Sequence, residues 1–313
     1  MLRSLRALTY HHPLGARQTS AVTNRRALKR KWVKALQAEG IPEPELAVKY
    51  IVDHLTRSNR PKGHVCVTRS DDLVSRAESM LEQRRRRVPL QYIIGEWDFR
   101  NVTLKTIAPV LIPRPETEQL VDHVLTSCQS TSHGAEGWVW FLDVGCGSGA
   151  ISIALLAERP ELRGVAIDIS TEAVDLTKEN AIMNNVQGRL DVMQASIGNC
   201  SNLTFGGRLF DILVCNPPYI PSHVLQGLDP EVLWFEDHRA LDGGHDGLRV
   251  TVQVLEAAQS IVKKGGHIWL ELTADLDLRQ LMELNSHWRL SLHQSYSDFA
   301  HKILFHHLVN GQV

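Results

Sequence analysis

Asn216-Pro217-Pro218-Tyr219 brings together groups that could hold a reacting amine or amide, directly after the apolar run 211–215. That run is rich in apolar and β-branched residues, which predicts a buried strand. The two prolines cannot continue a strand ladder, and they stiffen the chain as it leaves the sheet. Because ligands of open α/β sheets lie at the carboxyl ends of strands, we expect Asn216, Pro217 and Tyr219 to face a ligand.

The predicted ligand group is a planar NH2. The side-chain oxygen of Asn216 and the carbonyl of Pro217 would accept its two hydrogens, and the Tyr219 ring would cover its plane. The four residues resemble the motif of methyltransferases that act on amide or exocyclic amino nitrogens. The purely structural alternative is a tight turn from strand to helix with an exposed tyrosine.

A second ligand-binding segment is predicted at Gly145-Cys146-Gly147-Ser148-Gly149, between an expected strand at 138–144 and an expected helix at 150–158. Glycines let a backbone turn sharply and approach a ligand closely. Asp168 ends the next expected strand, about 20 residues further on, where a carboxylate accepts ribose hydroxyls. A nicotinamide dinucleotide site would use the same parts, and the G-x-G-x-x-[GA] spacing alone is weak evidence.

The choice of cofactor depends on Asp143, two residues before the first glycine of that turn. Its carboxylate would repel a pyrophosphate but suits a cationic amino-acid ligand. No His, Lys or Tyr stands out as the acid of a hydride transfer. S-adenosylmethionine is therefore favoured over NAD, with Asn216 also expected beside it. The structural alternative for Asp168 is that its carboxylate caps the following helix or stabilises the turn at the end of the strand.

Composition narrows the class of protein. The net charge of −1 over 313 residues argues against a whole-protein electrostatic grip on nucleic acid. No apolar stretch reaches membrane-spanning length. The five cysteines form no CxxC pair, which indicates reduced thiols and no zinc site. The 15 histidines lack ligand spacing, so no metal is expected.

The first 38 residues contain arginines and lysines but no acid. Interspersed Ser and Thr and the absence of a long apolar region are typical of a mitochondrial transit peptide, which we expect over residues 1–26. A basic N-terminal arm is the alternative.

A small helical domain is expected over residues 27–95, because apolar residues recur there at three and four positions. The run Arg84–Arg87 would end its last helix and complement the helix dipole, with contact to RNA or an acidic partner as the alternative. Two short alternating stretches around Arg100-Asn101 predict a β-hairpin linker at 96–110. Residues 111–313 then alternate strand and helix and end in two strands joined by a turn. The expected fold is α/β, a Rossmann-like sheet that ends in an antiparallel hairpin, behind the helical domain.

Five segments, in their order along the chain, resemble the HemK/PrmC family of release-factor glutamine N5-methyltransferases. They are Gln91–Gly95, Ile112–Glu118, Leu142–Gly149, Asn216–Ile220 and Ala240–Leu248. The resemblance implies a class I methyltransferase domain that uses S-adenosylmethionine and a helical domain that recognises substrate. The implied substrate is the glutamine of the Gly-Gly-Gln motif of a peptide-chain release factor, with Arg114 and Glu116 among the residues that bind it.

With the predicted leader, a mitochondrial matrix enzyme that acts on organellar release factors as a monomer is expected. Two segments depart from the family pattern. Ala195-Ser196-Ile197 stands where an acidic residue is expected, which leaves adenine contacts open, and Asp298–Lys302 lacks the usual glycine and arginine. The alternatives are a DNA or RNA adenine methyltransferase, which should carry a basic, aromatic-lined surface, and a non-catalytic cofactor-binding module.

Overall fold

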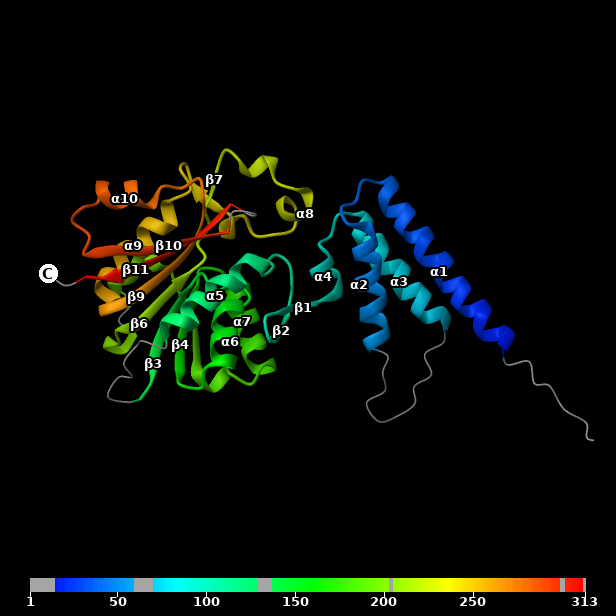
Figure 1. Ribbon diagram of the computed structural model, residues 1–313, viewed down its shortest axis with the longest axis horizontal. Coiled ribbons are helices and arrows are strands. Elements are labelled where there is room, and N and C mark those ends of the chain that lie inside the picture. The colour runs from blue at the N-terminus through cyan, green and yellow to red at the C-terminus, as the bar shows by residue number, and fades with distance from the viewer. Residues whose placement is uncertain (1–14, 59–69, 129–136, 203–204, 299–301, 312–313) are drawn as a thin grey trace, which may run out of the picture. The chain divides into compact units, whose positions relative to one another are not determined.

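The computed structural model describes residues 15–58, 70–128, 137–202, 205–298 and 302–311 (Figure 1). The chain divides into two compact units, residues 1–93 and 94–313. Most of the predicted leader, residues 1–14, lies outside the described residues, and so does the departure at 299–301. The described part of the leader belongs to the first helix, which continues past the expected boundary at residue 26.

The first unit consists of helices packed around one small core. Its elements are α1 (Gly15–Ala38), α2 (Pro44–Ser58) and α3 (Ser70–Arg85), followed by the short α4 (Leu90–Ile94) at the border of the second unit. Leu36, Ile51 and Leu81 are buried together between the three long helices. Within each helix the buried apolar residues recur mainly at three or four positions, for example Trp32 and Leu36 in α1 and Ala77 and Leu81 in α3. This spacing gives each helix one apolar face, which the neighbouring helices cover.

The arginines of the run Arg84–Arg87 are engaged within this first unit. The Arg85 guanidinium donates to Glu39 at 2.7 Å and to Glu82 at 3.0 Å. Arg84 donates to the carbonyl of Val88 and Arg87 to that of Gly40. Hydrogen bonds to the last carbonyls of a helix and to the turn beyond it stabilise that end, so the run closes α3 and orders the segments around it.

The second unit is built on a seven-stranded sheet with the order β10-β11-β9-β6-β3-β4-β5. The five strands from β9 to β5 are parallel, whereas β11 runs antiparallel to β9 and pairs with β10 as a hairpin. The predicted fold class, including the terminal antiparallel hairpin, is therefore confirmed. The strands are β3 (Val139–Val144), β4 (Leu162–Asp168), β5 (Leu190–Gln194), β6 (Phe210–Cys215), β9 (Val262–Thr273), β10 (Leu290–Asp298) and β11 (Ile303–Asn310).

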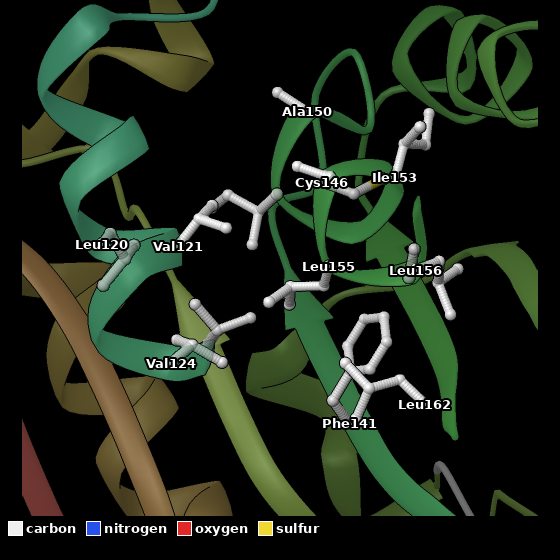
Figure 2. Packing of buried hydrophobic residues seen from close by; sticks show 14 of the residues in the cluster. Leu120, Val121, Val124, Phe141, Cys146, Ala150, Ile153, Leu155, Leu156 and Leu162 are labelled. Atoms are coloured by element: carbon white, nitrogen blue, oxygen red, sulfur yellow. The ribbon is translucent and has the colours of Figure 1, made fainter. Parts of the chain in front are cut away.

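Helices cover both faces of this sheet, since alternate residues of each strand point to opposite sides. Phe141 packs with α5 (Pro115–Cys128) and α6 (Ala150–Glu158), as Figure 2 shows. Its neighbour Leu142 packs on the other side with α9 (Arg249–Ile261) and α10 (Leu278–Leu284). Gly164 on β4 leaves room for the Phe141 ring, because an added Cβ would lie 2.2 Å from it. The central strands are thus buried on both faces, as their unbroken apolar sequence predicts.

Smaller elements complete the second unit. The hairpin of β1 (Glu96–Phe99) and β2 (Val102–Lys105) turns at Arg100-Asn101, as predicted, and packs against α6 and α7 (Thr171–Met183). A two-residue strand β7 (Ile220–Pro221) pairs with β8 (Asp242–Gly244), and α8 (Pro230–Leu233) lies between them in the chain. Short 3-10 turns lie at Gln187–Arg189, Ile197–Asn202, Phe205–Gly207, Leu225–Gly227 and His238–Ala240.

Candidate active site

A pocket of about 370 Å³ opens at the carboxyl ends of β3, β4, β5 and β6. Both sequence-predicted segments reach it. Its lining includes Gly145 and Gly147 from the turn after β3, Asp168 from the end of β4, and Asn216-Pro217-Pro218 from the end of β6. Parallel strands place their carboxyl ends at one edge of a sheet, so residues from distant parts of the sequence meet there.

The glycine turn divides into residues that face the pocket and residues that face the protein. Gly145 and Gly147 have φ values of 75° and 56°, and an added Cβ at either would meet no atom within 4 Å. At Gly149 an added Cβ would lie 2.8 Å from the Ile153 side chain, so that glycine is required for packing. Buried Cys146 and Ser148 do not line the pocket, although both were predicted as cofactor contacts. The open space at Gly145 and Gly147 is room for a ligand.

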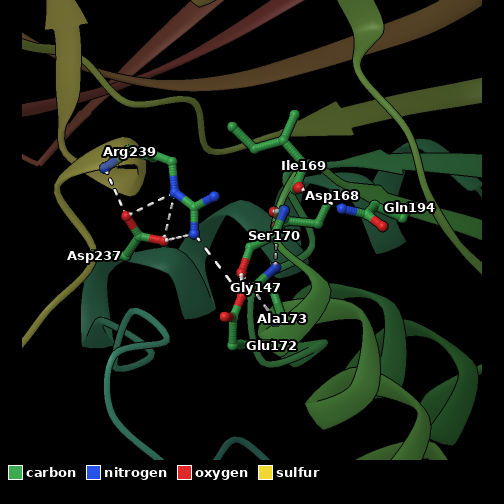
Figure 3. Close-up of polar contacts among 9 residues, drawn as sticks. All are labelled: Gly147, Asp168, Ile169, Ser170, Glu172, Ala173, Gln194, Asp237 and Arg239. Carbon is green, nitrogen blue, oxygen red and sulfur yellow. Dashed lines mark hydrogen bonds and ion pairs between the residues drawn. The ribbon is translucent and has the colours of Figure 1, made fainter.

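Asp168 is fixed at the pocket by two backbone donors. Its Oδ2 accepts from Gly147 N at 2.9 Å and its Oδ1 from Ser170 N at 2.9 Å (Figure 3). Burial raises the pKa of this carboxyl, and the backbone hydrogen bonds lower it. Each carboxylate oxygen keeps a second lone pair. Asp168 can therefore accept hydrogen bonds from hydroxyl groups of a ligand while it holds the glycine turn.

Asp143 does not line the pocket, so its predicted place beside the ligand stays a prediction. Its side chain is fully buried, and Oδ2 accepts from Ser152 Oγ at 2.6 Å and from Ser152 N at 3.2 Å. Asp143 follows the strand alternation onto the face that α6 covers, so its carboxylate joins β3 to that helix. Burial raises the pKa of Asp143 to about 7.

The Asn216 amide is held by two side-chain acceptors. Its Nδ2 donates to Glu271 Oε1 at 2.8 Å and to Thr117 Oγ1 at 3.1 Å. Among the described residues no donor bonds to its Oδ1 or to the Pro217 carbonyl. The two acceptors that the sequence predicts are therefore available. Burial raises the pKa of Glu271 to about 7, whereas the hydrogen bonds with Thr117 and Asn216 lower it.

Tyr219 does not line the pocket; its ring packs partly buried against the cores on both faces of the sheet. Burial, followed by the charge of Glu271, raises the pKa of its phenol. Two glycines of the segment 240–248 lie against the backbone here. An added Cβ at Gly243 would lie 2.7 Å from the Pro218 carbonyl oxygen, and one at Gly247 2.5 Å from that of Tyr219. Because these two positions are glycines, the segment 240–248 can lie close against the Asn-Pro-Pro-Tyr turn and support it.

Arg114 and Glu116, predicted to bind substrate, lie outside the pocket lining. Arg114 Nη2 pairs with Glu236 Oε2 at 2.6 Å, and the Glu236 side chain is almost completely buried. Because a buried carboxylate needs its partner, Arg114 holds the segment after α8 in place, a role that its sequence context did not indicate. Glu116 is half-buried at the first turn of α5, where its charge raises the pKa of Glu271.

Several lining residues were not predicted as site residues. Ala195-Ser196-Ile197 borders the pocket although it lacks the expected acid, and Gln253 reaches it from α9. Asp237 and Arg239 line another side and pair at 2.6 Å (Figure 3). Burial raises the pKa of Asp237, but the hydrogen bonds and charge of Arg239 outweigh it and leave the pKa lowered. No motif in the sequence around these residues indicates a site, because only the folding of distant segments onto one another brings them to the pocket.

Neither a metal centre nor a membrane span is found in the described ranges. No three His, Cys, Asp or Glu side chains there gather in a way that could hold a metal ion. No helix in the same ranges has the length and apolar character needed to cross a bilayer.

The comparisons with known proteins agree with this geometry. Residues 27–95 match the family model of the PrmC N-terminal domain, and residues 124–228 match that of the methyltransferase small domain. The MTRF1L release factor glutamine methyltransferase of Homo sapiens is 38% identical over 77% of this chain and 73% of its own length. The release factor glutamine methyltransferase of Caulobacter vibrioides is 38% identical over 66% of this chain and 68% of its own.

Among solved structures, the ribosomal protein L11 methylase of Lactobacillus delbrueckii subsp. bulgaricus is 15% identical, with a TM-score of 0.43, over 64% of this chain and 81% of that one. This likeness is too weak to bear on the assignment, which the sequence relatives carry. The chain belongs to the family of release factor glutamine methyltransferases.

Proposed function

We propose that this protein transfers a methyl group from S-adenosylmethionine to the side-chain nitrogen of the glutamine in the Gly-Gly-Gln motif of a peptide-chain release factor. The observation that carries the proposal is the pocket in which the glycine turn and the Asn216-Pro217-Pro218 turn meet. The names of the relatives support the choice of substrate.

The pocket fits the proposed cofactor. Gly145 and Gly147 leave open space for a ligand, and Asp168 offers acceptors suited to ribose hydroxyls. S-adenosylmethionine supplies an electrophilic methyl group on a positively charged sulfur. We expect Asp168→Ala to weaken its binding by about 1.5–3 kcal/mol, the contribution of a hydrogen bond to a charged group. Calorimetry measures this, and tight binding of NAD without binding of S-adenosylmethionine would contradict the assignment.

The proposed chemistry is an in-line displacement by an amide nitrogen, a weak nucleophile because its lone pair is delocalised into the carbonyl. Asn216 Oδ1 and the Pro217 carbonyl accept hydrogen bonds from the two N–H groups of the substrate amide. This arrangement favours localisation of the nitrogen lone pair toward the methyl group. Most of the acceleration comes from alignment of nitrogen, carbon and sulfur, an effect that reaches about 7–11 kcal/mol in well-oriented systems. Tyr219 supports the turn from its partly buried position.

The test of substrate class is incubation with labelled S-adenosylmethionine and separate pools of purified release factor, DNA and rRNA. We expect label only in the release factor, and none in a factor whose Gly-Gly-Gln glutamine is replaced by alanine. Label in either nucleic acid would favour the adenine methyltransferase, and no label in any pool would favour a non-catalytic module. The engagement of Arg84 to Arg87 within the first unit supports the protein substrate.

We assign recognition of the substrate to the helical domain, residues 27–95, together with the segment 114–118, in a monomeric enzyme. A flexible loop loses ordering entropy when it is held, so binding of the whole folded factor should be required. Equal methylation of an isolated Gly-Gly-Gln peptide and of the whole factor would count against this.

We place the enzyme in the mitochondrial matrix on the composition of its first 38 residues, with residues 1–26 as the transit peptide. Fusion of residues 1–38 to a fluorescent reporter should deliver the reporter to mitochondria, and deletion of residues 1–26 should leave an active cytosolic enzyme. A diffuse reporter would make this segment a basic arm only.

A further inference from the structure

Glu271 lies on β9 beside the turn that carries Asn216, and only 1% of its surface is exposed. The neighbouring strand β6 runs parallel to β9, with Cys215 paired to Leu270, so the residues that follow these two are adjacent. Glu271 Oε1 accepts from Asn216 Nδ2 at 2.8 Å. Its Oε2 is buried and has no hydrogen-bond partner among the described residues. The groups that face this carboxyl are Thr117, Asn216, Tyr219, Glu116 and Arg114.

Packing does not explain a carboxylate at this position. The residues that share its face of the sheet, Trp269 on β9 and its partner Phe305 on β11, are buried aromatic residues. A buried carboxylate with one unpaired oxygen has a large desolvation cost, and apolar side chains of similar volume are often neutral or stabilising in its place. Glu271 therefore lowers stability relative to an apolar residue, which points to a role in the site.

We propose that Glu271 is a positioning residue that holds the Asn216 amide with Oδ1 turned toward the substrate. This proposal rests on the proposed function. An asparagine amide has nearly the same shape in its two flipped orientations, and its hydrogen-bond partners select one of them. An ionised carboxylate only accepts, so it selects the orientation in which Nδ2 faces β9. Thr117 Oγ1 accepts from the same NH2 group.

The carboxylate also strengthens the acceptor. Hydrogen bonds in a chain polarise one another in a low-dielectric interior. A charge-assisted bond from Nδ2 to Glu271 therefore places more negative charge on Asn216 Oδ1, the atom that accepts from the glutamine N–H. The Glu271 side chain acts only through Asn216 and does not line the pocket.

The test compares Glu271→Met, which removes the acceptor, with Glu271→Gln, which keeps one, at pH 8, above the pKa of about 7 that burial gives Glu271. We expect Glu271→Met to lower kcat about 100-fold, the lower end of the effect of losing one preorganised hydrogen-bonding group, because Asn216 then loses its fixed orientation. The Kd for S-adenosylmethionine should stay within threefold of the wild type. Glu271→Gln should recover at least a tenth of the wild-type kcat. A wild-type kcat in Glu271→Met, or an equal loss in both variants, would overturn the proposal.

A double-mutant cycle separates positioning from general support. In an Asn216→Ala background, Glu271→Met should change kcat by less than about twofold, because residues that act as a unit are not additive. A full additional loss in the double variant would assign Glu271 a separate structural role and overturn the proposal.

A readout without substrate keeps this test independent of the proposed function. The side-chain NH2 protons of Asn216 should exchange slowly with water in the wild type and in Glu271→Gln, and at least tenfold faster in Glu271→Met. Equal exchange rates in the wild type and Glu271→Met would overturn the positioning role. Failure of the wild type to methylate release factor would instead refute only the proposed function.

Discussion

The two turns that form the pocket are held in different ways. The glycine turn obtains its geometry from its own residues, whose φ values of 75°, 56° and 82° only glycine adopts readily. Its other supports, Asp168, Thr177 and Asn180, lie within 32 positions of the turn residues that they contact. The Asn216-Pro217-Pro218 turn depends on residues far along the chain. Thr117 lies 99 positions before Asn216, Glu271 lies 55 positions after it, and Gly247 lies against the Tyr219 carbonyl.

This difference teaches where a site is sensitive to distant changes. A turn held by segments close to it in the chain responds mainly to changes in those segments, whereas a turn held by distant segments responds to changes far along the chain. In this protein the turn expected to hold the cofactor is the locally supported one. The turn expected to hold the reacting amide depends on β9, α5 and the segment 240–248.

Removal of the Asn216 side chain should have the largest effect on turnover. Asn216→Ala deletes Oδ1, so kcat should fall about 10²–10³-fold, the effect of losing one preorganised hydrogen-bonding group, while binding of S-adenosylmethionine stays nearly intact. Asn216→Asp keeps an acceptor and should retain more activity, and Tyr219→Phe should be mild. Single-turnover assays on the release factor measure all three. Wild-type rates in Asn216→Ala would refute the mechanism.

Gly247→Ala tests whether the segment 240–248 supports the turn that carries Asn216. The added Cβ would lie 2.5 Å from the Tyr219 carbonyl oxygen, at a φ of 80°, so the Asn-Pro-Pro-Tyr turn must move. Such overpacking costs about 1–3 kcal/mol, and we expect kcat to fall at least tenfold. Gly265→Ala is the matched control, because that glycine also has a positive φ but open space around its Cβ. An equal kcat in the two variants would show that support from Gly247 is unimportant.

A pair of alanine substitutions tests the glycine turn. Gly147→Ala puts a Cβ into the space left for the ligand, so the Kd for S-adenosylmethionine should rise about tenfold or more, the effect of about 1–3 kcal/mol of overpacking. Gly149→Ala puts its Cβ 2.8 Å from Ile153 instead, so thermal stability should fall further than in Gly147→Ala. Calorimetric titration and thermal unfolding separate the two. Equal changes in both variants would contradict the division of this turn.

Asp143→Asn should alter the pH dependence of stability more than activity. Burial raises the pKa of Asp143 to about 7, whereas in the unfolded chain it titrates near its ordinary value of about 4. Between these values the folded state holds a proton that the unfolded state has lost, so this group's contribution to stability falls as pH rises from about 4 to 7. The free energy of unfolding of Asp143→Asn should therefore rise relative to the wild type between pH 5 and pH 8.

Urea unfolding at the two pH values measures that difference. Burial lowers the pKa of His306 and His307 to about 4, which gives the opposite pH dependence. Both histidines are present in both proteins, so their contribution cancels in the comparison. Parallel stabilities of the variant and the wild type across this range would contradict the assignment of a buried, raised pKa to Asp143.

The order of strands and helices was predictable because each element carries its own periodicity and its own turn residues. The glycine turn, Asp168 and Asn216 were predictable for a similar reason, since they lie next to strand ends. Glu271 was not, because on a buried strand only tertiary pairing shows that it meets Asn216. The ion pair of Arg114 with buried Glu236 was not predictable either, because a local segment does not show a partner 122 positions away.

The position of β11 between β9 and β10 has a consequence for biosynthesis. β10 joins the sheet only through β11, which the ribosome makes after it. Until residues 303–310 are synthesised, β9 remains an open edge, a hazard for pairing with other chains. Phe305 on β11 is the partner of Glu271 on β9. The nascent chain therefore encloses the carboxylate behind Asn216 only after β11, which is made later than β9 and β10, has been inserted between them.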